Sequence, residues 1–161
     1  MVFIGFSVQL AYYSENNLTS FYMEDLKMKF KKEPVGRQRI VVAGLAGVVA
    51  SFLPWWSISF GSFGSASVNG WHSYGMLTTI ASLAIVLNWL LPKVGVKYNL
   101  PWKEEILLKI FSVAMLAGPV LWIIDTSFSF SMIGLGVYLA LVAGGVAVYY
   151  SFAKTLPKAT K

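Results

Sequence analysis

The chain has 161 residues, 57% of them hydrophobic and only 12% charged, which is far more apolar than a soluble globular domain. It contains no cysteine, and this excludes disulfides, thiolate metal sites, thioether-bound haem and cysteine nucleophiles. The formal net charge of +6 is also found in nucleic-acid-binding proteins, but here membrane topology explains the positions of the cations more simply, and no nucleic-acid partner is expected.

The first 22 residues fit neither a membrane span nor a signal peptide. Their apolar part, residues 2–13, is too short to cross a bilayer and lacks the basic start and small-residue cleavage site of a secretory signal. Met23 then opens a segment typical of the cytoplasmic arm of a membrane protein. We interpret residues 1–22 as an extension ahead of the native start, with a short membrane-surface segment as the alternative.

A short amphipathic helix is predicted over residues 20–32. Acids occupy its first turn and lysines its later turns, as the helix dipole favours. Met23, Leu26 and Phe30 recur at helical spacing and form an apolar stripe flanked by lysines. Two interpretations stay open: a helix lying on the inner leaflet of the membrane, or an ordinary solvated basic arm. Pro34 ends the helix in either case.

Four apolar stretches follow, each close to the ~20 residues that cross about 30 Å of hydrocarbon. They cover residues 39–58, 72–91, 106–124 and 130–152. The predicted fold is therefore an all-α integral membrane protein, a bundle of four transmembrane helices. Its domains are a cytoplasmic arm (1–38), the transmembrane bundle (39–152) and a basic cytoplasmic tail (153–161).

The cations define the orientation of the predicted bundle. All thirteen Lys and Arg residues lie in or beside the first, third and fifth segments that flank the spans, and the second and fourth segments contain none. Cytoplasmic segments of membrane proteins carry such an excess of cations, so both termini are predicted to be cytoplasmic, with the bundle in the plasma membrane. The same cations are expected to interact with the anionic lipids of the inner leaflet.

The segment between the first two spans is predicted to form a short outer β-hairpin. Residues 57–60 and 65–68 each alternate polar and apolar side chains, and the glycines between them favour a turn. We expect the apolar face of this hairpin to close over the outer ends of the helices, with Trp71 buried against them. Tryptophans near span ends are typical anchors at the membrane–water interface. The predicted anchors are Trp55, Trp56, Trp71 and Trp102.

Small residues at four-residue spacing mark the helix faces that approach each other most closely in a membrane. Such stripes occur in the first and fourth spans, and they predict that these two spans pack backbone to backbone. The alternative is that one stripe faces a second copy of the chain. The residues are Ala43, Gly47 and Ser51 in the first span and Gly136, Ala140 and Gly144 in the fourth.

Few polar side chains fall within the predicted spans. Asn88 and Lys109 have similar depths near the inner ends, which allows a hydrogen bond between them, and Lys109 can also extend to the inner surface. His72 and Asp125 fall at the outer interface, either as a pair or as two solvated groups. Two ligands are too few for a zinc site. Pro119 is expected to kink the third span and to free a backbone carbonyl.

No nucleophile elbow, phosphate-binding glycine loop or convergent pair of carboxylates is present in the sequence. We therefore expect neither enzymatic activity nor a cofactor or metal. The predicted function is that of a non-catalytic accessory or assembly subunit, which acts through helix packing with other membrane-protein subunits or with itself. The alternative is a small oligomeric transporter or channel, whose polar path would have to form between copies of the chain.

Single cysteines at Ser65 and Lys97 test the predicted orientation in this cysteine-free chain. Because Lys97 belongs to a cationic segment and Ser65 to an uncharged one, an impermeant maleimide should label only the cysteine at position 65 in intact cells. Labelling is compared before and after the cells are permeabilised. Labelling of position 97 in intact cells would reverse the predicted topology.

Overall fold

The computed structural model describes residues 22–96, 102–126 and 132–153. The chain divides into two compact units, Met1–Glu33 and Pro34–Lys161. In the first unit, residues 22–31 are helical. The proposed extension, apart from its last residue, and the basic tail, apart from its first, lie outside the described residues.

The second unit contains four long helices and a two-stranded hairpin between the first two helices. All four helices are long and apolar enough to span a membrane. This confirms the predicted bundle of four apolar helices and the predicted hairpin. The helices are α2 (Val35–Phe52), α3 (Gly75–Lys93), α4 (Glu104–Thr126) and α5 (Leu135–Phe152).

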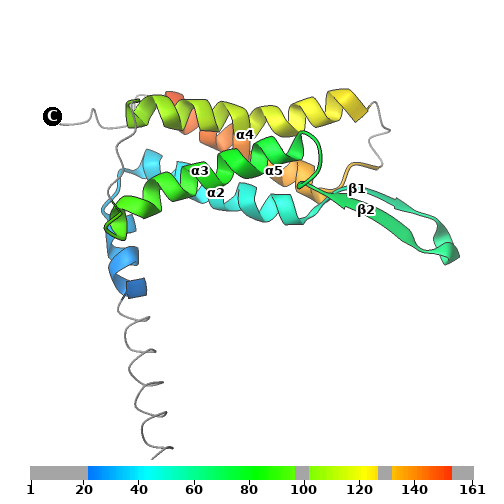
Figure 1. Ribbon diagram of the computed structural model, residues 1–161, viewed down its shortest axis with the longest axis horizontal. Coiled ribbons are helices and arrows are strands. Elements are labelled where there is room, and N and C mark those ends of the chain that lie inside the picture. The colour runs from blue at the N-terminus through cyan, green and yellow to red at the C-terminus, as the bar shows by residue number, and fades with distance from the viewer. Residues whose placement is uncertain (1–21, 97–101, 127–131, 154–161) are drawn as a thin grey trace, which may run out of the picture. The chain divides into compact units, whose positions relative to one another are not determined.

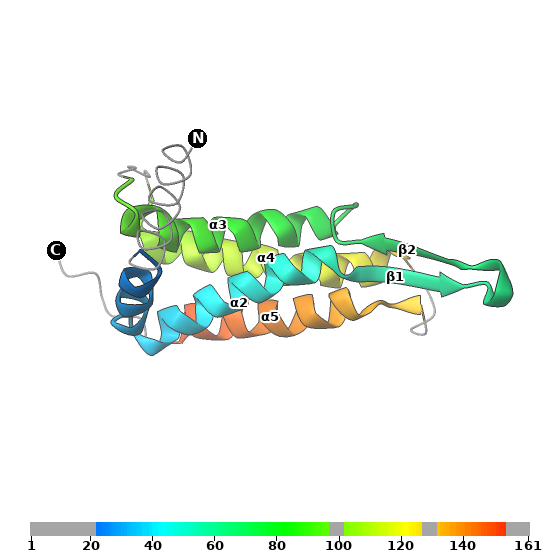
Figure 2. The ribbon, with the colours of Figure 1, turned by 90° about the horizontal axis from the view of Figure 1, so that it is seen from below.

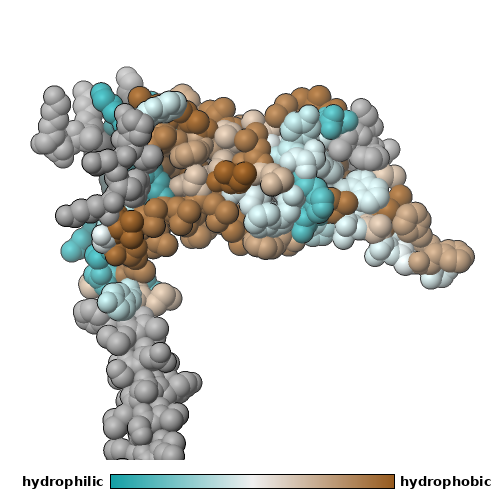
Figure 3. Space-filling model, viewed as in Figure 1, coloured by the Kyte–Doolittle hydropathy of each residue, from teal (hydrophilic) through white to brown (hydrophobic). Residues whose placement is uncertain are grey.

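Each helix of the bundle runs opposite to the next one in the chain and packs against two neighbours. Helix α2 contacts α3 and α5, and α4 contacts the same two helices, so the four form a closed ring (Figure 1, Figure 2). Large apolar side chains such as Val49, Ile80 and Val142 are exposed on the outside of this ring. Apolar residues also cover much of the face seen in Figure 3. Such an outer surface suits contact with lipid tails.

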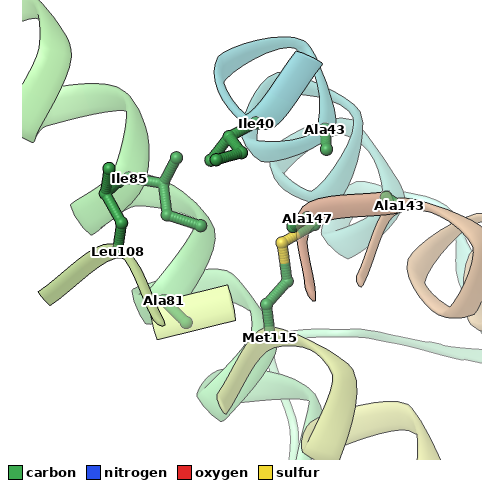
Figure 4. Close-up of a cluster of buried hydrophobic side chains, with 8 residues drawn as sticks. All are labelled: Ile40, Ala43, Ala81, Ile85, Leu108, Met115, Ala143 and Ala147. Atoms are coloured by element: carbon green, nitrogen blue, oxygen red, sulfur yellow. The ribbon is translucent and has the colours of Figure 1, made fainter. Parts of the chain in front are cut away.

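The centre of the bundle is filled by a cluster of buried apolar side chains drawn from all four helices (Figure 4). Met115 reaches from α4 toward Ala147 on α5, while Ile40 and Ile85 face each other from α2 and α3. Half of the cluster is alanine, which lets the helices approach closely. The members are Ile40, Ala43, Ala81, Ile85, Leu108, Met115, Ala143 and Ala147.

The prolines on both sides set the bounds of α2, which differ from the predicted span of residues 39–58. The helix starts directly after Pro34 and ends at Phe52, and the residues that follow form a strand. Leu53 is extended, with φ −76° and ψ 158°, because the ring of Pro54 disfavours helical geometry in the residue before it. The apolar run that continues past this point therefore belongs to the hairpin.

Helix α5 begins at Leu135, five positions later than the predicted start at Phe130. Gly134 is extended, with φ −79° and ψ 163°, and its N–H donates to the carbonyl of Trp55 at 2.8 Å. Ile133 forms an isolated antiparallel bridge with Trp56. Pairing with the hairpin therefore holds Ile133 and Gly134 out of the helix.

The hairpin consists of β1 (Pro54–Ser59) and β2 (Ser65–Asn69), joined by a single 3₁₀ turn over Gly61–Phe63. The strands pair antiparallel, with Ser57 opposite Ser67 and Ile58 opposite Ala66. Because side chains alternate along a strand, serines line one face of the hairpin and apolar residues line the other. Trp56, Ile58, Ala66 and Val68 make up the apolar face.

All six small residues expected at helix contacts are buried, and α2 and α5 lie side by side. Gly136 packs against α2, because a methyl group there would lie 2.8 Å from the carbonyl oxygen of Ala50. Gly47 instead faces the side chains of Ser82 and Met115, and Gly144 faces the backbone of Leu116 on α4. The stripes thus serve contacts with three neighbouring helices, and the glycines at positions 47 and 144 do not meet each other.

Gly144 and Gly145 form a matched pair for testing this packing. A methyl group on Gly144 would lie 2.8 Å from Leu116 Cα, whereas one on Gly145 would meet nothing within 4 Å. Gly144→Ala should therefore lower the stability of the bundle by about 1–3 kcal/mol. Gly145→Ala should raise stability by up to about 1 kcal/mol, since alanine favours helix. Thermal unfolding in detergent measures both, and equal stability of the two variants would contradict the close contact at Gly144.

Candidate functional site

The hairpin stands out beyond the helix ends instead of folding across them (Figure 1, Figure 2). At its tip, Phe63 is 93% exposed and Phe60 is 54% exposed. Trp71, which was expected to be buried against the helix ends, is 41% exposed. The predicted cap over the bundle is therefore wrong. A two-stranded ribbon has too little apolar surface on one face to fold back when its base is already held in another direction.

Trp55 closes the hairpin end of the bundle in place of Trp71. Its side chain is 0% exposed, and its indole N–H donates to the carbonyl of Ala50 at 2.9 Å. Its ring meets Trp122 of α4 edge to face, with the centroids 6.0 Å apart. A methyl group on Gly70 or Gly136 would collide with this indole. Trp55 is therefore a core residue and not an anchor at the water interface.

Three backbone contacts fix the direction in which the hairpin leaves the bundle. The N–H of Gly134 donates to Trp55, and Ile133 pairs with Trp56, so the start of α5 holds the base of β1. The N–H of Gly70 donates to the carbonyl of Ser51 at 2.9 Å, so the end of α2 holds the base of β2. Since the bases of both strands are bonded to helix ends, the projection of the hairpin follows from the packing of the bundle.

The other three predicted anchors are all at least partly exposed. Trp56 is half-buried at the base of the hairpin, and Trp102 is exposed before the start of α4. Trp71 lies edge to face against Phe52, with the ring centroids 5.5 Å apart. These placements leave the predicted anchoring role at the interface as a prediction for Trp56, Trp71 and Trp102.

An open hollow of about 340 Å³ lies beside the hairpin base. Within it, Asn69 Oδ1 accepts a hydrogen bond from the N–H of Trp71 at 3.2 Å and lies 3.2 Å from His72 Nδ1. An amide oxygen only accepts, so in this contact Nδ1 of His72 is the donor. The lining residues are Phe52, Pro54, Ser67, Val68, Asn69 and His72.

The structure does not bring His72 and Asp125 together. The imidazole of His72 is bonded to Asn69, and among the described residues no ion pair joins it to Asp125. Ser73, the next residue, has φ 51°, a left-handed conformation that non-glycine residues seldom adopt. This turn directs the chain from the hairpin base into α3. Within the described ranges, no group of three or more His, Asp or Glu side chains is placed to hold a metal ion.

Inside the bundle, a hydroxyl group satisfies the carbonyl that a proline leaves open. Pro119 lacks the N–H that would bond the carbonyl of Met115 one turn earlier in α4. Thr78 of α3 is 0% exposed, and its hydroxyl donates to that carbonyl at 3.2 Å. A methyl group on Gly118 would collide with the Thr78 hydroxyl. Helices α3 and α4 are thus joined at one defined register.

Three other hydroxyl groups of the bundle bond within their own helix. Thr79, Ser51 and Ser151 each donate to a carbonyl of their own helix. Asn88 is buried near the end of α3. The ammonium group of Lys109 lies 5.5 Å from the ring centroid of Phe152, a cation–π contact that the sequence did not indicate.

An ion pair between Arg37 and Glu104 joins the first turns of α2 and α4 at the end of the bundle opposite the hairpin. The two residues are 67 positions apart in the chain, and no local pattern marks them as partners. The Arg37 side chain is 25% exposed, so the pair is partly shielded from water. It connects two helices that are not neighbours in the ring.

No protein family, curated protein or solved structure matches this chain.

The contact between Thr78 and Met115 is tested by a double-mutant cycle. Thr78→Val keeps the shape of the side chain and leaves the carbonyl of Met115 without a donor, so it should cost about 1–3 kcal/mol of stability. In a Pro119→Ala background the backbone N–H returns, and the same substitution should cost clearly less. Thermal unfolding in detergent measures the four proteins.

Ser151→Ala is the control for this cycle, because the hydroxyl of Ser151 donates only to the carbonyl of Val148 in its own helix. Its small cost should be the same in both backgrounds. If Thr78→Val costs the same with proline and with alanine at position 119, the hydroxyl does not serve the carbonyl that the proline frees.

Proposed function

We propose that the protein is a non-catalytic subunit of the plasma membrane that binds another membrane protein through its hairpin. The observation that carries this proposal is the position of Phe63, 93% exposed at the tip of an uncharged ribbon that extends past the helix ends. In the proposed orientation both termini are cytoplasmic and the hairpin is on the outer side.

The chemistry of the hairpin supports a binding role. It carries no charged side chain, and the apolar face with Trp56 and Ile58 is followed by exposed Phe60 and Phe63 at the tip. Burying a phenylalanine side chain against a partner contributes about 1.5–3 kcal/mol, and aromatic residues that enter a partner's pocket dominate many interfaces. The partner surface that suits this hairpin is an apolar recess with hydrogen-bonding groups for the serines of the other face.

The packed centre of the bundle supports the same proposal over the transporter or channel. The side chains of Ile85 and Met115 at the centre are 0% exposed, and alanines from α5 pack against them. A polar path through one copy would need these residues to separate. A pore made by this protein would therefore have to run between copies of the chain.

A photoreactive phenylalanine analogue at position 63 tests the proposal in living cells. The proposed contact predicts protein adducts from position 63, and mass spectrometry identifies the chain that is captured. The same analogue at Val142 of α5, which is 65% exposed, is the matched control and should contact mainly lipid.

The outcomes separate the proposed function from its alternative. Unrelated membrane proteins captured at position 63, and absent at position 142, support an accessory subunit. Adducts with the same chain alone, together with ion flux after reconstitution into liposomes, would favour the channel. If position 63 gives no more protein adducts than position 142, the hairpin does not bind a partner protein.

A further inference from the structure

The helix over residues 22–31 has two unlike sides. At 3.6 residues per turn, Met23, Leu26 and Phe30 fall on one side, and Met23 is 59% exposed. Lys27 borders this apolar side. Met28 lies on the opposite side and is also exposed. Leu26 and Phe30 are half-buried. An apolar stripe with lysine at its edge is the pattern of a helix that lies flat at a membrane surface.

The charges are arranged unevenly along this helix. Both acids are in its first turn, and one of them, Asp25, pairs with Lys29 at 2.6 Å. Residues 27–32 then contain four lysines and no acid. Lys27 and Lys32 are exposed. The second half of the segment is therefore a cluster of cations, which complements a surface of anionic lipid headgroups.

The covalent chain keeps this cation cluster near the membrane. Helix α2, which is apolar enough to span a membrane, begins at Val35. Only residues 32–34 separate it from the end of the preceding helix. At about 3.5 Å for each extended residue, this linker bridges no more than about 14 Å. Because the linker is short, binding of this helix to the headgroups costs little conformational entropy of the chain.

From these observations we infer that residues 22–31 bind the surface of an anionic bilayer. The apolar stripe enters the headgroup region, and the lysines contact lipid phosphates on either side of it. This inference is independent of the hairpin and of any partner protein. It adds recognition of lipid composition, by the helix over residues 22–31, to the partner binding proposed for the hairpin.

The full-length protein, reconstituted in lipid nanodiscs, is suitable for the test because it has no native cysteine. An environment-sensitive fluorophore is attached to a single cysteine at Leu26 or at Met28. These positions are two residues apart, carry no charge and fall on opposite sides of the helix. In discs that contain phosphatidylglycerol, we expect emission at shorter wavelength from position 26 than from position 28. Equal emission from both positions would overturn the inference.

Lipid charge is tested with the same labelled proteins. In discs of phosphatidylcholine alone, the difference between positions 26 and 28 should shrink. The variant Lys27→Gln/Lys32→Gln should reduce it in anionic discs, while the thermal stability of the bundle stays unchanged. If the difference persists in neutral discs and in this variant, the helix binds through its apolar side alone, and the inferred preference for anionic lipid is wrong.

Discussion

A backbone carbonyl buried away from water needs a donor from the protein, and this constraint determines how α3 and α4 meet. Pro119 leaves the carbonyl of Met115 without its usual donor, and the hydroxyl of Thr78 on α3 takes that role at 3.2 Å. The absence of a side chain at Gly118 permits the approach. Helix α3 starts just after the hairpin, and α4 carries Trp122, whose ring contacts the buried indole of Trp55 at the bundle end. The register of α3 against α4 therefore positions the elements around the hairpin base.

The same requirement for bonded backbone groups explains the direction of the hairpin. A loop that leaves a membrane helix has to satisfy its amides and carbonyls with partners nearby. Here Gly134 bonds one strand and Ser51 bonds the other, while Trp55 fills the space between their attachments. A ribbon held at both strand bases continues along the bundle. Nothing in the described part of the chain covers the tip of the hairpin, so its phenylalanines stay exposed and can contact a partner.

Hydropathy and alternation were sufficient to predict four apolar helices and the hairpin, because both patterns depend on residues that are close in sequence. The contacts that define the candidate site join residues far apart in the chain, and no local pattern distinguishes them. Trp55 lies at the start of β1 and Trp71 lies just past β2. Only Trp55 is buried, where the glycines at positions 70 and 136 leave room for its indole and Trp122 packs against it. The open carbonyl at Pro119 was foreseeable, whereas its donor Thr78 became evident only from the packing of α3 on α4.

The uncharged hairpin also bears on how such a chain enters a membrane. In the proposed orientation, everything between α2 and α3 crosses the bilayer during synthesis, and each lysine or aspartate in that stretch would oppose the crossing by about 2.5–3.5 kcal/mol near the bilayer centre. The connection between α2 and α3 contains no lysine or aspartate. Its serines and glycines pass at lower cost, and its phenylalanines favour the passage. Helices α2 and α3 can thus enter together as one helical hairpin, with the ribbon at their joint drawn across before α4 is made.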